Sequence, residues 1–565
     1  GGSKATLTYW NVIFISLKWR TLCASLTACD EDHVMTAADT DATPMECEIK
    51  LAGSMGALRS AEAVIRRFAG GSVSWQTDAL LSIYYDTADR RLAQRGATLR
   101  VRRKNRTYTQ TVKAAAEGPT GALANRPEWN VEIGGATPDP TLMPVAARTR
   151  LGLVLPGELK RLFAVDVSRK RANLSLDGGP EIGIAEVEVA VDRGTVKAGR
   201  AKDVISEVEI ELVCGNSSAI YDLATALAAC GLRVSHLTKA QRGYRLLDGA
   251  GAPAQPVRAQ KFILTPTMTV SDALGEIFQA SLANVLANEV PAVSGIDPEG
   301  IHQMRVSLRR MRSALAVFKG MIDAPGCQAL NVELKWLADS LGAARDWDVF
   351  VDEILGPVCG VGIDMEGLAL LRQRAEVERT AGYGEAAAAI ESVRYTKLVI
   401  GLAKFIDTQA WVPASEADAA LLRASVDAVS GDILSHAYKK LRKKARGLRD
   451  MDIADRHRVR VALKKFRYTS EFLQALYPNA DVRRFNKALA RMQDQFGHLN
   501  DVSVAEDLLA RLIAVKGGTP AERRRAVAAA GQVMGWHARG LHDLEDKLLA
   551  DWKTLKSAPV FWKRR

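Results

Sequence analysis

The sequence predicts an α+β protein of more than one domain, in which an antiparallel β domain precedes an all-α domain. Its 565 residues exceed what a single hydrophobic core usually supports. Residues 45–247 alternate polar and apolar side chains with a period of two, which is typical of strands. From residue 263 the chain is rich in Ala, Leu and Arg with a period of 3.6, which is typical of helices.

The change of period defines the domain boundaries that we expect. Residues 46–50, 99–102 and 207–211 have strand-like alternation, and Gly, Pro and Asp turns separate such segments. Residues 249–256 (GAGAPAQP) have the composition of a linker. We therefore expect a strand domain over 45–247, a linker over 248–262 and a helical domain over 263–557.

The first 44 residues follow neither pattern. A short apolar run at 9–17 ends at Lys18 and Arg20, which leaves it shorter than most secretion signals. We expect residues 1–44 to be a disordered extension or a leader from a misplaced start. No later segment has the roughly 18 consecutive apolar residues that a membrane span needs, so no membrane partner is expected.

Charge and cysteine content restrict the partners and the compartment. The chain has 77 Lys and Arg against 65 Asp and Glu, which gives a net charge of +12. Such a surplus indicates a polyanionic partner, which is a nucleic acid, an anionic membrane or a phosphate polymer. The seven cysteines form no CxxC pair, which argues against a disulfide framework or a zinc site and for a reducing cytoplasm.

The helical half contains an internal duplication with a constant offset of 155 residues. Residues 302–312 (HQMRVSLRRMR) match residues 457–467 (HRVRVALKKFR). Residues 341–349 (LGAARDWDV) match residues 496–504 (FGHLNDVSV) at the same offset. Two separate matches at one offset predict two duplicated helical bundles, over about 263–415 and about 420–557.

Several strand segments carry charges of one sign on one face. Alternate residues of a strand point the same way, so acidic rows arise at 46–48 and 207–211 and basic rows at 100–104 and 169–171. A solvated face usually mixes the two signs. Segregated rows instead indicate a closed sheet with a charged interior. Carboxylates there would bind Mg²⁺ or Mn²⁺, and Arg and Lys would bind phosphoryl oxygens.

The order of these motifs resembles the CYTH family, the triphosphate tunnel metalloenzymes. The match begins with the ExExK pattern of residues 46–50. It continues through YYDT (84–87), LRVR (99–102), TVK (111–113), RPEW (126–129), DVSR (166–169), DRG (192–194), EVEIE (207–211) and KAQRGY (239–244). The resemblance implies an eight-stranded antiparallel β-tunnel that binds a triphosphate together with a divalent metal ion.

The resemblance also implies roles for single residues. The implied metal ligands are acidic: Glu46, Glu48, Glu207, Glu209 and Glu211. The implied phosphate-binding residues are basic: Lys50, Arg100, Arg102, Lys113, Arg169, Arg171, Lys239 and Arg242. Asn130 stands where many relatives have an acidic residue, which removes the basis for a metal role at that position.

Charge and positioning would drive hydrolysis in such a tunnel. Phosphoryl transfer needs neutralised phosphate oxygens more than covalent chemistry, and the motifs contain no Ser, Cys or His that must act as a nucleophile. We therefore expect direct attack by water, activated by a metal ion. The proton acceptor is either a tunnel carboxylate, such as Glu46 or Glu48, or Lys50 with a pKa lowered by neighbouring cations.

Each helical repeat carries a basic stripe. The first stripe falls within an arc of about 80° on a helix and comprises His302, Arg305, Arg309 and Arg312. The second comprises His457, Arg460, Lys464 and Arg467. A solvated helix face is one explanation. However, like charges three or four positions apart repel each other, so a duplicated stripe indicates a polyanion that relieves the repulsion.

The stripes resemble the CHAD family, whose HxxRVxxRRxR and LGxxRDxDV patterns occur within about 263–557. The resemblance implies that the stripe residues bind inorganic polyphosphate. In the second repeat Asn500 and Ser503 depart from the pattern, so we expect a weaker copy in the packing near Asp501. Metal binding by His302 and His457 is the competing hypothesis, but their Arg and Lys neighbours repel cations.

Together the resemblances predict an inorganic triphosphatase fused to a polyphosphate-binding module. We expect Mg²⁺ or Mn²⁺ as cofactor, triphosphate and polyphosphate as partners, and a location in the cytoplasm, in association with polyphosphate granules. The alternatives are an enzyme like the class IV adenylate cyclases and a non-catalytic, granule-associated polyphosphate-binding protein. Nucleic acid is not expected, because the helical half is poor in the aromatic residues that stack on bases.

Overall fold

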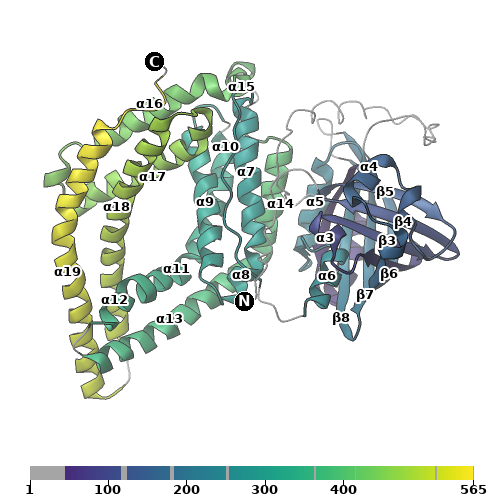
Figure 1. The fold of residues 1–565 in the computed structure, drawn as a ribbon, viewed down its shortest axis with the longest axis horizontal. Helices are drawn as coiled ribbons and strands as arrows, with labels where there is room; N and C mark the ends of the chain where they lie inside the picture. Colours follow the sequence, from purple (N-terminus) through teal and green to yellow (C-terminus); the bar gives the residue numbers. More distant parts are fainter. Residues whose placement is uncertain are drawn as a thin grey trace. The chain divides into compact units, whose positions relative to one another are not determined.

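The computed structural model describes residues 45–115, 124–177, 183–249, 254–322, 324–361, 364–413, 415–515 and 518–563. The chain divides into two compact units (Figure 1). One holds the residues up to Ala252 together with Val399–Thr408, and the other holds the rest of the chain from Pro253 onward. The extension expected over 1–44 lies outside the described residues. Within the described ranges, no helix has both the length and the apolar character that crossing a membrane requires.

The first unit is built on a closed antiparallel sheet. Its long strands are β1 (Met45–Ala52), β2 (Gln76–Asp86), β3 (Ala97–Lys104), β4 (Thr107–Ala114), β5 (Ala124–Ile133), β6 (Lys160–Asp177), β7 (Ile184–Ala198) and β8 (Ala201–Cys214). They lie in the order β5-β4-β3-β2-β6-β7-β8-β1, and the pairing of β1 with β5 closes the ring. In the described part of the chain, the predicted eight-stranded tunnel is therefore confirmed. A ninth strand, β9 (Arg233–Val234), adds two residues beside β1.

Strand alternation gives the ring a charged interior and an apolar exterior. On β8, Glu207 and Glu209 alternate with Val208 and Ile210, and all four side chains are buried. The helices α2 (Met55–Phe68) and α5 (Ser218–Ala228) pack on β8. They cover the apolar residues, so the glutamates face the inside of the ring. Two short helices, α3 (Arg91–Gln94) and α4 (Val145–Leu151), pack beside β3.

One helix fills the apolar part of the interior. The helix α6 (Lys239–Leu247) begins at a capping box formed by Thr238 and Gln241, and it packs on β6, β7 and β8. Its Ala240 belongs to an apolar cluster with Phe163 and Val167 of β6. These β6 residues share a strand face with the charged residues of the tunnel. The helix α6 therefore closes the apolar end of the cavity that holds the charges.

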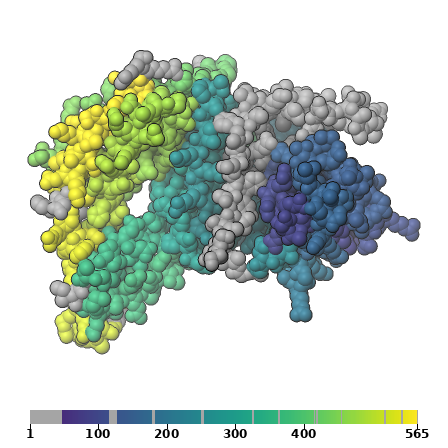
Figure 2. Space-filling view, viewed as in Figure 1, coloured from purple at the N-terminus to yellow at the C-terminus, as the bar shows by residue number. Residues whose placement is uncertain are grey.

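Helices make up most of the described residues of the second unit, and no strand longer than an isolated bridge occurs among them. Its helices are α7 (Val270–Ala287), α8 (Glu289–Ser294), α9 (Glu299–Val317), α10 (Ala324–Ser340), α11 (Gly342–Val349), α12 (Gly356–Cys359), α13 (Met365–Glu391), α15 (Glu416–Arg423), α16 (Val426–Lys444), α17 (Ile453–Leu473), α18 (Ala480–Ile513) and α19 (Pro520–Ser557). The helix α14 (Val393–Asp407) begins in this unit, and its residues from Val399 onward are grouped with the first unit. A π-helical turn, η3 (Phe350–Leu355), follows α11. Figure 2 shows an opening in this unit, between the teal surface of the first copy and the yellow-green surface of the second.

The duplication extends to complete helices. A shift of 155 residues places α7 on α16, α9 on α17 and α13 on the first part of α19. The same shift places α10, α11 and η3 on the single helix α18. The first copy is broken at Leu341, whereas α18 continues without interruption through Phe496. The two copies therefore have corresponding helices, as the sequence predicts.

The packing of α6 is testable at Gly243. A Cβ atom at this position would lie 2.2 Å from the ring of Phe163, so either the ring or the helix must move. We expect Gly243→Ala to lower the free energy of unfolding by about 1–3 kcal/mol. Gly134→Ala is the matched control, because no atom lies within 4 Å of its added methyl group. Equal thermal unfolding midpoints for the two variants would contradict the described packing.

Candidate functional site

Three buried carboxylates meet on the wall formed by β7 and β8. Carboxylate oxygens of Asp192, Glu207 and Glu209 lie within 4.8 Å of one another. Antiparallel register places Asp192 directly opposite Glu207. Both oxygens of Glu207 are buried and accept no hydrogen bond of ordinary geometry, although Lys50 and Lys239 lie within ion-pair distance. Such hard oxygen donors fit Mg²⁺ or Mn²⁺.

Three cations neutralise these carboxylates. The Nζ atoms of Lys50 and Lys239 lie 2.9 and 2.8 Å from Oε1 of Glu209. Arg169 donates to Asp192 from Nε and Nη2, at 2.8 and 2.7 Å, and also forms an ion pair with Glu209. Burial alone would raise the pKa of Glu209, but Lys239, Lys50 and Arg169 outweigh it and hold that pKa well below its usual value. The carboxylate of Glu209 is therefore ionised.

The pKa of Lys50 contradicts one expectation from the sequence. Burial alone would lower the pKa of Lys50, but Glu209, Glu48 and Glu207 outweigh it and raise that pKa. The lowered pKa that would make Lys50 a proton acceptor is therefore wrong for this arrangement, because carboxylates surround its ammonium group more closely than cations do. The other expected proton acceptor, a tunnel carboxylate, is not affected by this result.

The wall opposite the carboxylates carries cations. In the order of the closed ring, β3 lies four strands from β8 in either direction, so the two strands face each other across the tunnel. Arg102 of β3 lines a small interior pocket of about 10 Å³ together with Arg169, Asp192 and Lys239. Burial, Arg100 and Arg169 all disfavour the charge of Arg102 and lower its pKa to about 9. This wall therefore carries more positive than negative charge.

Glu128 of β5 supplies part of that negative charge. Its carboxylate lies 2.5 Å from Nζ of Lys113 and 3.5 Å from Nη2 of Arg100. Burial alone would raise the pKa of Glu128, but Lys113 and Arg100 outweigh it and lower the pKa to about 2. Asn130 donates to Glu128 at 3.2 Å and accepts from Thr111 at 2.7 Å. Asn130 therefore orients a carboxylate in this structure.

The structure brings most of the predicted tunnel residues together. The residues of the two facing walls are Glu48, Lys50, Arg100, Arg102, Lys113, Arg169, Glu207, Glu209 and Lys239. Glu211 pairs with Glu48 in the register of β1 and β8. The side chain of Glu46 lies outside the described residues.

Two predicted phosphate ligands have other partners. Arg171 lies 2.9 Å from Glu188 and 3.2 Å from Asp78 and is about one-third exposed. Arg242 lies 2.6 Å from Asp203 and 3.7 Å from Glu207. These ion pairs already neutralise both side chains, so neither guanidinium is as available to a phosphate as Arg102 is.

The sequence reasoning missed Asp192 and Glu128. Both stand inside matched motifs, but each is a single acid rather than part of an acidic row. A search for rows on one strand therefore passes over them. The pairing of Asp192 with Glu207 and of Glu128 with Lys113 follows only from the strand register.

In the helical unit, packing of α9 on α17 joins the basic stripes of the two copies. Arg305 and Arg309 of α9 act electrostatically on Lys464 of α17, as does Arg460 beside it. Burial is the largest effect on Lys464, and with these three cations it lowers the pKa of Lys464 to about 8. We call Arg305, Arg309, Arg460 and Lys464 the basic cluster.

Two atoms of the basic cluster lack hydrogen-bond partners. The Nε atoms of Arg305 and Arg460, which correspond in the duplication, are buried without an acceptor among the described residues. Other groups of the cluster are held in place: Nη1 of Arg305 donates to the Ala338 carbonyl at 2.5 Å, and Nε of Arg309 donates to Tyr468 at 3.2 Å. Fixed donors without acceptors indicate a site for an anion.

The remaining stripe residues lie outside this cluster. Arg312 donates to Asn331 at 3.1 Å, and Arg467 and His457 are exposed. Burial and Arg345 lower the pKa of His302. Among the described residues, the one group of His, Cys, Asp or Glu side chains suited to a metal ion is Asp192, Glu207 and Glu209. Metal binding by the two histidines therefore gains no support.

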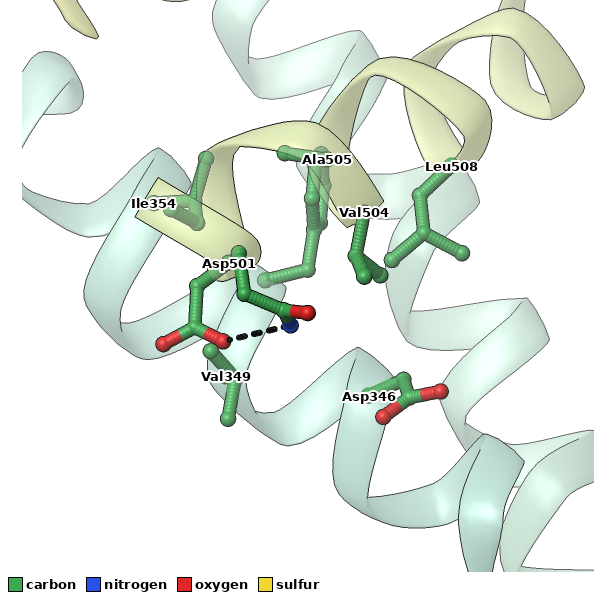
Figure 3. Close-up of a pocket in the computed structure, with 9 residues that line it drawn as sticks. Asp346, Val349, Ile354, Asp501, Val504, Ala505 and Leu508 are labelled. Atoms are coloured by element: carbon green, nitrogen blue, oxygen red, sulfur yellow. Dashed lines mark hydrogen bonds between the residues drawn. The ribbon is translucent and has the colours of Figure 1, made fainter. Parts of the chain in front are cut away.

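Two corresponding aspartates lie beside the basic cluster. Asp346 of α11 and Asp501 of α18 line a pocket of about 40 Å³ together with the corresponding Val349 and Val504 (Figure 3). Burial is the largest effect on Asp346 and raises its pKa, and Asp501 raises it further. The two copies thus meet at an acidic seam next to their shared cations.

The second copy lacks one ionic network near this seam. Asp348 of the first copy is buried and accepts hydrogen bonds from Arg379 at 2.8 Å and from Tyr383 at 3.0 and 3.2 Å. The corresponding residues of the second copy are Ser503, Met534 and Ala538. The acid and both of its donors are absent together. This loss of a network agrees with the expectation of a weaker copy near Asp501.

Family models assign both units. The model of the CYTH domain matches residues 45–244, and the model of the CHAD domain matches residues 276–510. The chain is a CYTH domain fused to a CHAD domain. The CYTH match covers the closed sheet, and the CHAD match covers the helical unit from within α7 to within α18, which leaves out α19.

Relatives of known sequence match parts of this CYTH–CHAD chain. An inorganic triphosphatase of Haemophilus influenzae is 30% identical over 164 residues, which are 29% of this chain and 44% of that relative. The chain thus spans less than half of that protein. An uncharacterized protein of Mycobacterium tuberculosis is 26% identical over 429 residues, which are 70% of this chain and 76% of the relative. The crystal structure of the CHAD domain from the plant Ricinus communis is 34% identical, with a TM-score of 0.46, and covers 54% of this chain and 99% of that domain.

The cost of a charge at Lys464, which arises first from burial and then from the neighbouring cations, is testable. Its pKa of about 8 lies below the value of 10.5 for an unburied lysine, so its charged form destabilises the folded state. We expect Lys464→Met to raise the free energy of unfolding by about 1 kcal/mol at pH 7 and low salt. The stability of the wild type should rise between pH 8 and 10.5 as Lys464 loses its proton, so the difference should close over that range.

Lys465→Met is the matched control, because Lys465 is the neighbouring, exposed lysine. Chemical denaturation of the two variants and the wild type measures the effect. A Lys464→Met protein that is less stable than the Lys465→Met protein at pH 7 would contradict a destabilising charge at Lys464.

Proposed function

We propose that the CYTH domain hydrolyses inorganic triphosphate with Mg²⁺ or Mn²⁺ and that the CHAD domain binds polyphosphate. The CYTH match and the triphosphatase relative support the reaction class. The observation that carries the proposal is the opposition of charge inside one closed sheet. Carboxylates on β7 and β8 face Arg102 and its neighbours on β3, so metal and phosphate can meet between them.

The carboxylate wall is the proposed metal site. Asp192, Glu207 and Glu209 would hold the ion, since their oxygens are close together and buried. A divalent ion there supplies neutralisation of phosphate charge and activation of water. Lys50 and Lys239 hold the same oxygens in this structure. On binding of metal and substrate, we propose that both ammonium groups turn from the carboxylates to phosphoryl oxygens.

The opposite wall is the proposed phosphate clamp. Arg100 and Arg102 project from alternate positions of β3, and Lys113 projects from the neighbouring β4. Their guanidinium and ammonium groups would bind non-bridging oxygens and neutralise the charge that spreads over them in the transition state. Because Lys50 keeps its proton in this arrangement, a carboxylate such as Glu48, which is 4% exposed, is the proposed acceptor of the proton from water.

The CHAD domain would raise the local concentration of phosphate chains near the tunnel. Binding through a tethered second site increases the encounter of chain ends with the first site without any new contact in the tunnel. The proposed ligands are the four residues of the basic cluster, in which the buried Nε atoms of Arg305 and Arg460 lack acceptors. The more exposed stripe residues His457 and Arg467, together with Arg312 and His302, are proposed as additional contacts.

The catalytic proposal is tested by phosphate release from tripolyphosphate, ATP and long-chain polyphosphate, with and without each metal. We expect the fastest release from tripolyphosphate and none without metal. Glu209→Gln should lower kcat by about 100-fold or more, because it removes one ionised oxygen from the metal site. Glu506→Gln, at an exposed position of α18, is the control.

Other outcomes would favour the alternatives. Cyclic AMP as the main product from ATP would support the cyclase alternative. Tripolyphosphate binding without turnover, or a Glu209→Gln enzyme as fast as the wild type, would support the non-catalytic binder.

The CHAD proposal predicts a salt-dependent affinity for polyphosphate. We expect the double variant Arg305→Gln and Arg460→Gln to weaken binding by about 10-fold or more, because each arginine offers a charge-assisted hydrogen bond. Loss of two cations should also make the affinity less dependent on salt. The double variant Arg523→Gln and Arg524→Gln, at exposed positions of α19, removes the same charge as a control. Equal losses of affinity in both variants would contradict a localised site.

A further inference from the structure

The helix α16 ends in a dense run of cations that none of the roles above uses. Residues 439–449 contain seven exposed cations and no Asp or Glu: Lys439, Lys440, Arg442, Lys443, Lys444, Arg446 and Arg449. We call these seven residues the basic end of α16. In the part of the chain that the structure describes, no carboxylate forms an ion pair with them. The next ion pairs along the chain belong to Arg456 and Arg458 of α17.

The duplication shows that the fold does not require these cations. A shift of 155 residues places the basic end on residues 284–294 of the first copy, around the end of α7, where the chain has no Lys or Arg. Asn284 and Asn288 of that segment are buried, and both donate to the Val257 carbonyl at 2.8 Å. The lysines at the two corresponding positions of the second copy are exposed. The first copy thus uses this helix end for packing, whereas the second copy leaves it open and charged.

Stabilisation of α16 itself accounts for only part of the run. Cations in the last turn of a helix interact favourably with its dipole, by about 0.3–1 kcal/mol each. Arg442, Lys443 and Lys444 lie in that turn. The other four residues of the basic end lie before the turn or after it. Repulsion between cations three and four positions apart opposes the effect of the dipole. A bound polyanion would relieve this repulsion.

The cations cover the whole exposed face of the helix end. At 100° per residue, the five that lie on α16 span an arc of about 200°, and the buried Tyr438 and Leu441 occupy the remainder. Each basic stripe of the helical repeats, in contrast, falls within about 80°. A narrow stripe suits a single chain of phosphates. A broad array suits a partner that presents phosphates on two strands, because one chain cannot contact cations on both sides of the helix.

The other residues of the run argue against two further classes of partner. Its apolar residues, Leu441, Ala445 and Leu448, are all buried in the helical unit, so none can insert into a bilayer. Residues 439–449 include no aromatic side chain, so they offer no surface on which the bases of a single strand stack. Contact with the phosphates of a duplex needs neither feature, because it depends on cations.

We propose that the basic end of α16 binds the phosphate backbone of double-stranded nucleic acid. The inference is independent of the proposed hydrolysis, and its residues differ from those proposed for polyphosphate. The scarcity of aromatic residues in the helical half argues against single strands and does not bear on a duplex. Exposed Lys and Arg side chains bind phosphates without regard to base sequence. The expected binding is therefore independent of sequence and weakens steeply with salt.

A variant of the full chain with four substitutions tests the surface: Lys439→Gln, Lys440→Gln, Lys443→Gln and Lys444→Gln. We expect its affinity for a short duplex DNA of mixed sequence, measured by fluorescence anisotropy at low salt, to be lower than that of the wild type by about 30-fold or more. The slope of log affinity against log salt should become shallower by about 3–4, since each lost phosphate contact releases close to one counterion fewer.

A matched control removes the same charge from α19: Arg523→Gln, Arg524→Gln, Lys547→Gln and Lys553→Gln. It should keep the duplex affinity within about threefold of the wild type, because salt screens charges that do not touch the duplex. The substituted side chains are exposed in both variants, so both should unfold at the wild-type midpoint.

Four results would overturn the proposal. The first is a wild type that does not bind duplex DNA at low salt, and the second is an equal loss of duplex affinity in both variants. The third is a greater loss of affinity for polyphosphate than for the duplex in the α16 variant, which would assign the basic end to the polyphosphate site. The fourth is a loss confined to vesicles of anionic phospholipid, which would assign it to a membrane surface.

Discussion

A charged side chain that points into a closed sheet loses most of its hydration, so an opposite charge must compensate it within the cavity. The CYTH tunnel meets this constraint with Lys50, Arg169 and Lys239 against Asp192, Glu207 and Glu209. The same pairs that stabilise the tunnel are those that a metal ion and a phosphate chain would replace. Under the proposed function, stability of the fold and binding of the substrate would therefore depend on one set of charges.

In two places the buried positive charge is only partly neutralised by acidic side chains. On the β3 wall the charge of Arg102 is disfavoured by burial and by its neighbours, and Glu128 reaches Lys113 and Arg100 but not the whole wall. In the CHAD domain, burial and the neighbouring cations lower the pKa of Lys464. An excess of buried cations over acids is costly to the folded state, and a bound polyanion removes that cost. In the proposed function, phosphate would bind to the surplus cations of each domain for the same physical reason.

The fold and most of the charge pattern could be predicted from the sequence, because both produce patterns that are visible along short stretches of the chain. Period-two alternation shows which glutamates share a face, and a constant offset reveals the two helical copies. Pairings across strands leave no such signal, so Asp192 beside Glu207 and Glu128 beside Lys113 emerge only with the register. The partners of Arg171 and the raised pKa of Lys50 depend on which charges converge in space, which no spacing along one strand determines.

The central claim is that a metal ion and a phosphate chain bind between the two charged walls of one tunnel. Anomalous diffraction from a crystal soaked with Mn²⁺ and tripolyphosphate measures this directly. The account predicts a manganese peak coordinated by Asp192, Glu207 or Glu209, with phosphates between it and Arg102. A manganese peak on the outer surface, with the phosphates away from Arg102, would contradict it.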